Sequence, residues 1–218
     1  MFSIIIPVKG TEPNLWKLLV YLHLYLSQHE YEVVVVLSDK DKTRETPNIP
    51  IYENVRVRFA VSYGDSLERA ILTGFSVAQG NKIIVMDADG SHAPEHVASM
   101  IALLDSHEMV VASRFASGGR YVTTLSRKIV SHIFNTYAQL LGSTLTDPMS
   151  GYFGIQAQLL QKMTFKPYKW KTALEISNKL RPSTIEVPYT FHNRASGKSH
   201  SSWKIGIKIL WDVMEGAL

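Results

Sequence analysis

The sequence predicts an α/β fold with a doubly wound sheet, on the strength of two observations. Short runs of β-branched, apolar residues recur through the N-terminal half, as is typical of strands buried on both faces of a parallel sheet. Segments of helical length separate these runs, and such alternation is typical of βαβ units. The chain has 218 residues, which is enough for one domain with a sizeable core.

The expected elements follow one another regularly up to residue 113. Asn14 is a plausible cap for the first helix, and Pro94 suits the first turn of the third. The alternating pattern VRVRFAV favours a strand of its own. We expect strands at residues 3–8, 32–37, 55–61, 82–87 and 108–113, and helices at residues 14–28, 66–79 and 94–107.

Beyond residue 113 the regular alternation of strands and helices ends. A Gly-rich loop precedes an expected helix at residues 125–141, and the segment TDPMSGYFGI then mixes turn signals with aromatic residues. We expect a short helix at 171–180, a strand at 184–191 and a polar loop at 192–202. The last segment, WKIGIKILWDVMEGAL, is expected to form an amphipathic helix. We therefore divide the chain into a domain of residues 1–202 and a C-terminal helix of residues 203–218.

The composition excludes several classes of protein. There is no cysteine, which excludes a disulfide framework and a thiolate metal site. The net charge of +4 is mild and the basic residues form no runs, so no nucleic-acid partner is expected. The N-terminus lacks the pattern of a signal peptide, and no stretch reaches the roughly 18 apolar residues that span a bilayer. We therefore expect a cytoplasmic protein, peripheral at most to the cytoplasmic face of a membrane.

The stretch KIIVMDADGSHAPE, residues 82–95, carries an apolar strand directly into two carboxylates. In open α/β sheets ligands bind beyond the carboxyl ends of the strands, so Asp87 and Asp89 are expected to face that crevice. Two carboxylates this close repel each other unless a positive charge lies nearby. Their oxygens suit Mg²⁺ or Mn²⁺, and such a cation would neutralise a diphosphate. The alternative is that Asp87 caps the turn and Asp89 is solvated.

Several segments together resemble the family 2 glycosyltransferases of the GT-A fold: SIIIPV, VVVVLSDKDKT, SLERAILTGFSVAQGNKIIVMDADGSHAPE and VVASRF. SRKIVSHIFN, LTDPMSGYFGI and FHNRASGKS narrow the resemblance to the polyprenyl-phosphate glycosyltransferases. It implies a Rossmann-like, doubly wound, mixed but mostly parallel sheet flanked by helices. It also implies an inverting, metal-dependent transfer of mannose or glucose from GDP-mannose or UDP-glucose to a polyprenyl (dolichyl) phosphate.

On the donor side, the resemblance implies that Asp87 and Asp89 bind the metal and the donor diphosphate. Ser91 occupies the stretch where the family often has a metal-binding Gln, and it is a shorter and weaker ligand. The resemblance further implies that Pro7 begins the loop near the base, and that Asp39 or Asp41 contacts the base or ribose. The alternative for these two aspartates is a solvated turn.

At the start of the chain, PVKGTEPNL lacks the Asn-Glu that often follows the first Pro in the family. Glu12 is the residue that could stand in for it. The polar loop is expected to close over the donor phosphates through Arg194 and Lys198, beside Ser199. His200 occupies a position where Lys is usual. Either Lys198 supplies that charge, or His200 makes binding pH-dependent near neutrality.

The acceptor phosphate is expected to be bound by cationic side chains. A phosphate monoester has a second pKa near 6, so it is largely an oxyanion at neutral pH and attacks without a general base. Arg pairs with phosphate in a bidentate way, and Arg114 follows a strand at the same edge as the acidic pair. Arg127 and Ser131 are four residues apart and share one helix face. The resemblance implies that these three residues clasp the lipid phosphate.

Asp147 matches an acidic position of the family that acts as a base in relatives with a hydroxyl acceptor. In this chain we expect it to orient its neighbours or to cap a turn. The C-terminal segment carries Trp, Lys and apolar residues at helical spacing. It could lie at a membrane surface, meet a membrane-embedded partner, or pack against the protein's own sheet.

Two other functions compete with sugar transfer. A sugar nucleotidyltransferase would use a similar sheet and metal, although PVKGTEPN is a poor version of the Gly-rich phosphate loop of such enzymes. A non-catalytic relative that only binds a nucleotide sugar is suggested by Ser91 and by the altered N-terminal motif.

Overall fold

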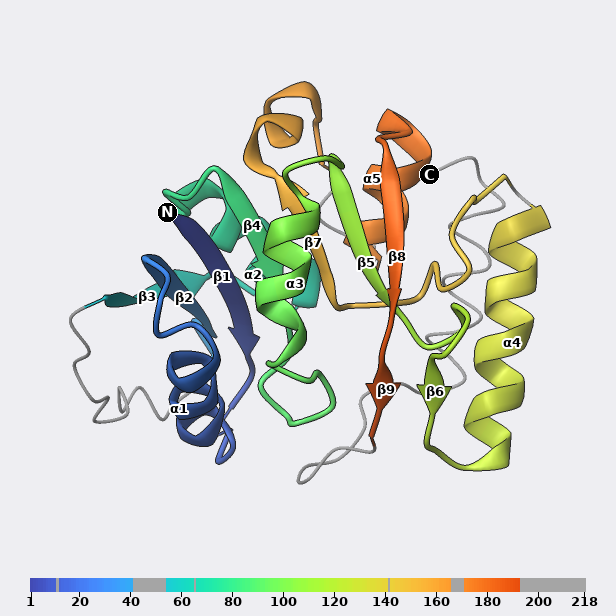
Figure 1. Cartoon of the computed structure of the whole chain (residues 1–218), viewed down its shortest axis with the longest axis horizontal. Coiled ribbons are helices and arrows are strands. Elements are labelled where there is room, and N and C mark those ends of the chain that lie inside the picture. Colours follow the sequence, from blue (N-terminus) through green and yellow to red (C-terminus); the bar gives the residue numbers. More distant parts are fainter. Residues whose placement is uncertain (11, 41–53, 65, 141, 166–170, 193–218) are drawn as a thin grey trace.

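A mixed β-sheet with helices on both faces organises the chain (Figure 1). The computed structural model describes residues 1–10, 12–40, 54–64, 66–140, 142–165 and 171–192. Within them the main sheet has the order β3-β2-β1-β4-β7-β5-β8, and β6 pairs with β9 in a second sheet. The strands are β1 (Phe2–Val8), β2 (Tyr31–Ser38), β3 (Val55–Ser62), β4 (Lys82–Val85), β5 (Met109–Ser113), β6 (Arg120–Tyr121), β7 (Phe153–Gln156), β8 (Thr184–Pro188) and β9 (Thr190–Phe191).

The strands of the main sheet run in one direction except for β7. Strand β7 is antiparallel to both of its neighbours, β4 and β5, whereas the other pairings are parallel. The parallel strands therefore end at the same edge of the sheet, which is the lower edge in Figure 1, and β7 begins there. The predicted fold class, a doubly wound, mixed but mostly parallel sheet flanked by helices, is confirmed.

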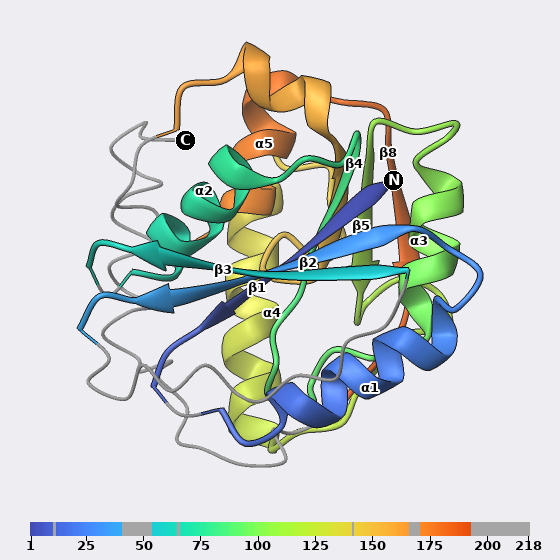
Figure 2. The same ribbon diagram turned by 90° about the vertical axis from the view of Figure 1, so that its left-hand side faces the viewer.

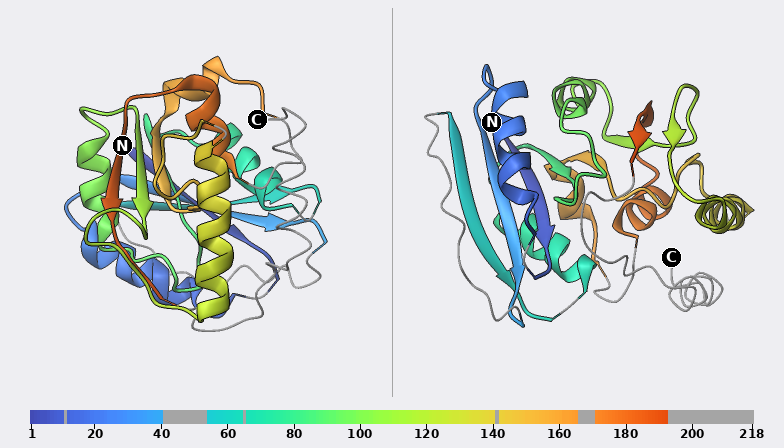
Figure 3. Two further views of the ribbon diagram at one scale, coloured as in Figure 1. Left: turned by 90° about the vertical axis from the view of Figure 1, so that its right-hand side faces the viewer. Right: turned by 90° about the horizontal axis from the view of Figure 1, so that it is seen from below.

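Two sets of helices cover the two faces of the sheet, as Figures 1 and 2 show. Helices α1 and α3 supply Leu22 and Met100 to the hydrophobic cluster on one face. Helices α2 and α5 supply Phe75 and Ile176 to the cluster on the other. Helix α4 stands apart at the far end, beyond β8 (Figure 3). The helices are α1 (Leu15–Tyr25), α2 (Leu67–Val77), α3 (His96–Leu103), α4 (Leu125–Leu140) and α5 (Thr172–Leu180), with a 3₁₀ helix, η1 (Ala157–Lys162).

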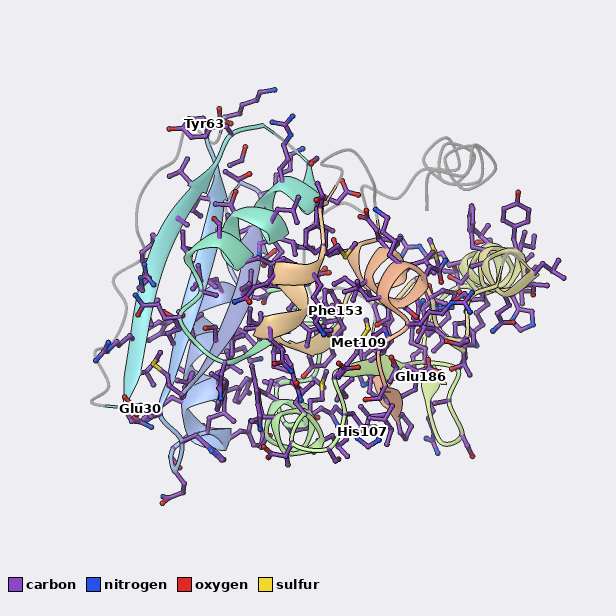
Figure 4. All side chains as sticks on the ribbon, turned by 90° about the horizontal axis from the view of Figure 1, so that it is seen from above. Glu30, Tyr63, His107, Met109, Phe153 and Glu186 are labelled. Atoms are coloured by element: carbon purple, nitrogen blue, oxygen red, sulfur yellow. The ribbon has the colours of Figure 1, made fainter. Side chains whose placement is uncertain are left out.

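Strand β1 lies in the middle of the sheet and shows why its sequence is apolar on consecutive positions. Ile4, Ile5 and Ile6 are all inaccessible to solvent, because helices cover both faces at this point. Burying each of these side chains stabilises the fold by roughly 1.5–3 kcal/mol. In β7, Gly154 allows close packing, because a Cβ there would lie 2.6 Å from Cδ1 of Ile84. Figure 4 shows Phe153 and Met109 in the interior of the molecule.

One strand was not expected, and two expectations about the strands were wrong. The turn-rich segment around residue 150 leads into β7, whose first residue Phe153 pairs with Val85 and Val111. The strand expected to run to residue 87 ends at Val85. The strand expected at 184–191 is two strands, because β8 pairs with β5 and β9 pairs with β6. Pro188 ends β8, as expected for a residue that lacks a backbone N–H donor.

The helix boundaries agree with expectation to within a few residues. Helix α3 begins at His96, two residues after Pro94, and the Asn14 side chain makes no capping hydrogen bond to α1. Among the described residues, none of the helices combines the length and the apolar character needed to cross a bilayer.

Candidate active site

The candidate active site lies where β4, β5 and β7 meet the lower edge of the sheet, viewed end-on in the right panel of Figure 3. Strands β4 and β5 bring Asp87 and Arg114 to this edge, since each residue lies just beyond the end of its strand. Because β7 runs the opposite way, the loop that precedes it arrives at the same edge and carries Asp147. Three segments far apart in the sequence therefore deliver charged side chains to one place.

The two aspartates differ in their surroundings. The Asp87 side chain is 30% exposed, whereas Asp89 is buried with 7% of its surface exposed. Asp89 Oδ1 accepts a hydrogen bond of 3.0 Å from the backbone N–H of Ser91, which is itself buried. Gly90 between them has a φ of +81°, a conformation that a side chain would strain. The turn is thus built to hold the Asp89 carboxylate at a fixed position.

His92 holds the backbone of the same turn from inside the protein. The backbone N–H of Asp87 donates to Nδ1 of His92 over 2.8 Å, so the other ring nitrogen, Nε2, carries the proton. The ring stacks on Tyr152 at 4.9 Å and meets the edge of Tyr189. Burial lowers the pKa of His92 although Asp87 and Asp89 oppose the shift, and the imidazole is therefore neutral at pH 7.

Arg114 and Asp147 form a buried, bidentate ion pair. Arg114 Nε lies 2.7 Å from Asp147 Oδ2, and Nη2 lies 2.6 Å from Oδ1. The Asp147 side chain is inaccessible and that of Arg114 is 9% exposed. Burial alone would lower the pKa of Arg114, but the hydrogen bonds and charge of Asp147 raise it above its usual range. The guanidinium is therefore permanently charged.

Aromatic rings and a second carboxylate fix this pair in place. The guanidinium carbon of Arg114 lies 4.5 Å from the ring centre of Tyr121 and 5.6 Å from that of Phe191. On the other side, Glu186 of β8 accepts a hydrogen bond of 3.1 Å from the backbone N–H of Asp147. Both members of the pair are therefore held rigidly.

Arg127 and Ser131 lie on helix α4, beyond the Arg114 pair. The Ser131 hydroxyl donates to the Tyr121 hydroxyl over 3.3 Å, and the Tyr121 ring packs against the Arg114 guanidinium. Ser131 is thus linked to Arg114 through the Tyr121 side chain. Arg127, one turn earlier on α4, is exposed. The structure brings Arg114 and Ser131 together and leaves Arg127 at the protein surface.

Helix α4 is also unusual in its exposed apolar surface. Asn135 and Ala138 are its buried residues. Leu125 is 73% exposed and Ile133 is 56% exposed, and Ile129, Val130 and Leu140 are exposed as well. This set of exposed apolar residues, which we call the α4 apolar face, lies on the same helix as Arg127 and Ser131.

The remaining residues predicted for the donor side lie along the neighbouring strands. Pro7 pairs with Val36 near the end of β1. Asp39 follows β2 and accepts a hydrogen bond of 2.8 Å from the backbone N–H of Gly64. Glu12 accepts hydrogen bonds from the backbone and side-chain nitrogens of Asn14, at 3.1 and 3.0 Å, at the start of α1.

Some predictions fall outside the described residues. These are the contacts expected from Asp41, Arg194, Lys198, Ser199 and His200, and the helix expected at residues 203–218.

A half-buried lysine of the site, Lys171, was not predicted from the sequence. Lys171, beside the first turn of α5, donates from Nζ to the carbonyl of Met149 over 2.7 Å. Burial lowers the pKa of its ammonium to about 8, and Arg114 adds to the shift, whereas Asp147, Asp87 and Glu68 oppose it. Lys171 therefore interacts electrostatically with Asp87 as well as with the Arg114–Asp147 pair. The segment KWKTALEI gave no signal, because the lysine reaches the site only through the packing of α5.

The turn that carries Asp87, Asp89 and Ser91, which we call the aspartate turn, offers hard oxygen donors for a divalent cation. No cluster of three or more His, Cys, Asp or Glu side chains that could hold a metal occurs among the described residues. Two carboxylates and the Ser91 hydroxyl remain, and they fit Mg²⁺ or Mn²⁺ in sites completed by water and substrate phosphates. A metal held in this way needs the diphosphate as a ligand.

Comparison with protein families gives a match to the model described as Glycosyl transferase family 2, over residues 3–164. A dolichol-phosphate mannosyltransferase of Pyrococcus furiosus is 31% identical over 90% of this chain and 58% of its own length. A dolichol-phosphate mannosyltransferase of Saccharomyces cerevisiae is 29% identical over 98% of this chain and 86% of its own. The chain thus spans little more than half of the Pyrococcus protein.

Solved structures agree with the fold. The crystal structure of a mycobacterial protein superposes with a TM-score of 0.70 at 14% identity, over 98% of this chain and 73% of the other. Glucosyl-3-phosphoglycerate synthase from Mycobacterium tuberculosis, in complex with Mn²⁺, uridine diphosphate and phosphoglyceric acid, gives a TM-score of 0.67 at 16% identity. That match covers the whole of this chain and 77% of the synthase.

Proposed function

The chain belongs to glycosyl transferase family 2, and we propose that it transfers a hexose from a nucleotide-sugar donor to a polyprenyl phosphate. The names of the curated relatives favour mannose as the sugar and a dolichyl-type phosphate as the acceptor. GDP-mannose is accordingly the first donor to test, and UDP-glucose the second.

The observation that carries the proposal is the double hydrogen bond between Asp147 and Arg114. A hydroxyl acceptor needs a base to remove its proton. Asp147, at the family position that supplies such a base, is a poor one, because both of its oxygens are bonded to a permanently charged guanidinium. An acceptor that is already an oxyanion has no need of a base. A phosphate monoester meets this requirement at neutral pH.

The reaction then consists of one displacement. An oxygen of the acceptor phosphate forms a bond to the anomeric carbon, and the bond from that carbon to the donor diphosphate breaks. The electron pair of that bond leaves with the nucleoside diphosphate, so no proton needs to move. Attack opposite the leaving group inverts the anomeric configuration. Arg114, Arg127 and Ser131 would hold the acceptor phosphate in line, which is where positioning lowers the barrier.

Asp87, Asp89 and Ser91 would hold Mg²⁺ or Mn²⁺ together with the donor diphosphate. The bound cation supplies charge stabilisation to the departing diphosphate. Pro7, Glu12, Asp39 and Asp41 remain our candidates for the nucleoside side of the donor. Arg194, Lys198 and Ser199 remain candidates for closing over its phosphates.

The α4 apolar face supports a lipid as the carrier of the acceptor phosphate. Exposed Leu125, Ile129 and Ile133 lie on the helix that also carries Arg127 and Ser131. A lipid phosphate bound by the polar residues would place its hydrocarbon chain beside this face. We propose that the protein works peripherally, at the cytoplasmic face of a membrane, with α4 toward the lipid.

A matrix of donors and acceptors tests the proposal. Labelled GDP-mannose and UDP-glucose are each incubated with Mn²⁺ and either a polyprenyl phosphate or the corresponding polyprenol, and lipid-linked sugar is extracted into butanol. We expect transfer to the phosphate and none to the alcohol. Equal transfer to both would contradict the proposal, as would donor binding without transfer to any acceptor. Release of pyrophosphate from a nucleoside triphosphate and a sugar phosphate would indicate a nucleotidyltransferase instead.

A further inference from the structure

A network of hydrogen bonds joins the loop that carries Asp147 to β5 and β8. The Glu186 carboxylate, on β8, accepts hydrogen bonds from the backbone N–H of Thr146 at 2.8 Å, from the Thr146 hydroxyl at 2.9 Å and from the backbone N–H of Asp147 at 3.1 Å. The Thr146 hydroxyl also lies 2.8 Å from the hydroxyl of Ser113, the last residue of β5. Glu186 therefore fixes the backbone from which Asp147 reaches Arg114.

The direction of each hydrogen bond in this network follows from the groups involved. Ser113 Oγ accepts hydrogen bonds from the backbone N–H groups of Phe115 and Ala116, at 3.2 and 2.9 Å. Because these two bonds occupy the lone pairs of Ser113 Oγ, its proton is donated to Thr146 Oγ1, and the Thr146 proton is donated to Glu186. The three hydrogen bonds described for Glu186 are thus all donated to it. Such an arrangement suits a carboxylate and does not suit an amide.

We propose that Glu186 is a positioning residue for the acceptor phosphate, and that it acts through Asp147 on the orientation of Arg114. Asp147 accepts from Nε and Nη2 of the guanidinium, so the direction of the remaining N–H groups of Arg114 follows from the position of Asp147. A shift of about 1 Å in a positioning group can slow a reaction by about a hundredfold. The inference rests on the proposed function, in which Arg114 binds the acceptor phosphate.

The Nε–H proton of Arg114 gives a readout that does not depend on sugar transfer. Because Nε lies 2.7 Å from Asp147 Oδ2 in a buried pair, this proton should exchange slowly with water. Proton–nitrogen NMR of the whole protein measures the exchange, and loss of the signal in Arg114→Lys assigns it. Glu186→Gln keeps the size of the side chain but turns an amide NH₂ toward hydrogen-bond donors. We expect exchange of the Arg114 Nε–H to be at least about tenfold faster in this variant.

Kinetic measurements distinguish positioning of the acceptor from a general structural role. In Glu186→Gln we expect kcat/KM for polyprenyl phosphate to fall at least about tenfold, while KM for GDP-mannose stays unchanged. Glu108→Gln is the matched control, because Glu108 Oε2 accepts a hydrogen bond of 3.0 Å from the backbone N–H of Ser183 where β5 and β8 begin, at the opposite edge of the sheet. The control should alter neither the exchange nor the kinetics. A general loosening of the sheet predicts equal effects in the two variants and a change in KM for the donor as well.

Thr146 provides a second pair of variants if Glu186→Gln does not fold. Thr146→Val removes the hydroxyl that links Ser113 to Glu186, and Thr146→Ser keeps it. Exchange of the Arg114 Nε–H should be faster in Thr146→Val than in Thr146→Ser. Equal exchange in these two variants overturns the inference, and so does a failure of all three variants to fold, because the network would then serve folding alone.

The outcomes separate this inference from the proposed function. Exchange that is already fast in the wild type, or that is unchanged in Glu186→Gln, overturns the role of Glu186 and leaves the proposed function intact. Faster exchange with unchanged kinetics for the acceptor overturns the role too, since the pair would then be independent of acceptor binding. Wild-type protein that transfers sugar to no acceptor overturns the proposed function, while the exchange measurement still shows whether Glu186 orients Arg114.

Discussion

Arg114 and Asp147 face each other in a fork-to-fork pair, with two nitrogen-to-oxygen distances of 2.7 and 2.6 Å. The backbone N–H of Arg114 donates to the same carboxylate over 3.0 Å. A carboxylate with this many donors orients a cation and does not act as a base. The pair therefore holds Arg114 at a fixed position, which in the proposed function lies beside the acceptor phosphate.

Asp147→Asn should damage both stability and activity. The change leaves the buried Arg114 charge without its counter-charge, and breaking one side of a buried pair costs about 3–5 kcal/mol. Urea unfolding measures the loss. Asp105→Asn is the control, because Asp105 pairs with Lys82 but is 75% exposed. Its loss should stay below about 1 kcal/mol. An equal loss of unfolding free energy in the two variants would show that the buried pair stabilises the protein no more than the exposed pair does.

Arg127→Met should weaken binding of the acceptor more than binding of the donor. Arg127 is exposed on α4 and would be one of the cations that hold the acceptor phosphate. We expect KM for polyprenyl phosphate to rise about tenfold, because a hydrogen bond to a charged group contributes about 1.5–3 kcal/mol. KM for the donor should change little. Lys128→Met removes an adjacent exposed charge from another side of α4, and an equal effect there would argue for general attraction by the helix.

The α4 apolar face should recognise the lipid part of the acceptor. We expect Ile129→Ser and Ile133→Ser together to raise KM for long-chain polyprenyl phosphates, while short, water-soluble phosphates are used as before. The reason is the loss of apolar contact area with the chain. Leu24→Ser is a matched control, since Leu24 is 63% exposed on α1, on another part of the protein. A KM that depends on chain length in the same way in the double variant and the wild type would exclude this role.

Glu32 should make stability depend on acid pH. Burial alone would raise its pKa, but hydrogen bonds from Ser3, Gln79 and Arg58 hold the pKa below its ordinary value of 4.5. As pH falls below 4.5, the unfolded chain takes up the proton first, so the stability that charged Glu32 contributes is lost progressively.

Chemical unfolding of Glu32→Gln at a series of pH values measures this contribution. The variant should be less stable than the wild type at pH 7, and the difference should shrink as pH falls below 4.5. A difference that is constant with pH would mean that the charge of Glu32 contributes nothing.

The sequence predicted most of the fold because the decisive signals are local. Runs such as Ile4–Ile5–Ile6 and the helical segments between them reveal buried parallel strands without knowledge of any partner. Strand β7 escaped prediction because its four residues follow a turn-rich segment and are stabilised by β4 and β5, which lie far away in the sequence. The division of the expected strand at Pro188 was missed for the same reason, because β8 pairs with β5 whereas β9 pairs with β6.

The candidate site was predictable to the extent that each residue follows its own strand. Asp87, Asp89 and Arg114 lie directly after apolar runs, and the structure places them at the same edge. The pairing of Arg114 with Asp147 depends on the antiparallel insertion of β7, and the approach of Lys171 depends on how α5 packs. Neither arrangement has a local signature, because both are set by tertiary contacts.

If the aspartate turn serves sugar transfer to a phosphate, removing one of its carboxylates must slow that transfer. Transfer of labelled mannose from GDP-mannose to polyprenyl phosphate is measured with Mn²⁺ for the wild type, Asp89→Ala and Asp105→Ala. We predict that Asp89→Ala loses at least about a hundredfold in rate, since charge stabilisation of the leaving group is lost, while Asp105→Ala, changed at the opposite edge, retains the wild-type rate. Transfer by Asp89→Ala at the wild-type rate would show that the aspartate turn takes no part in the reaction.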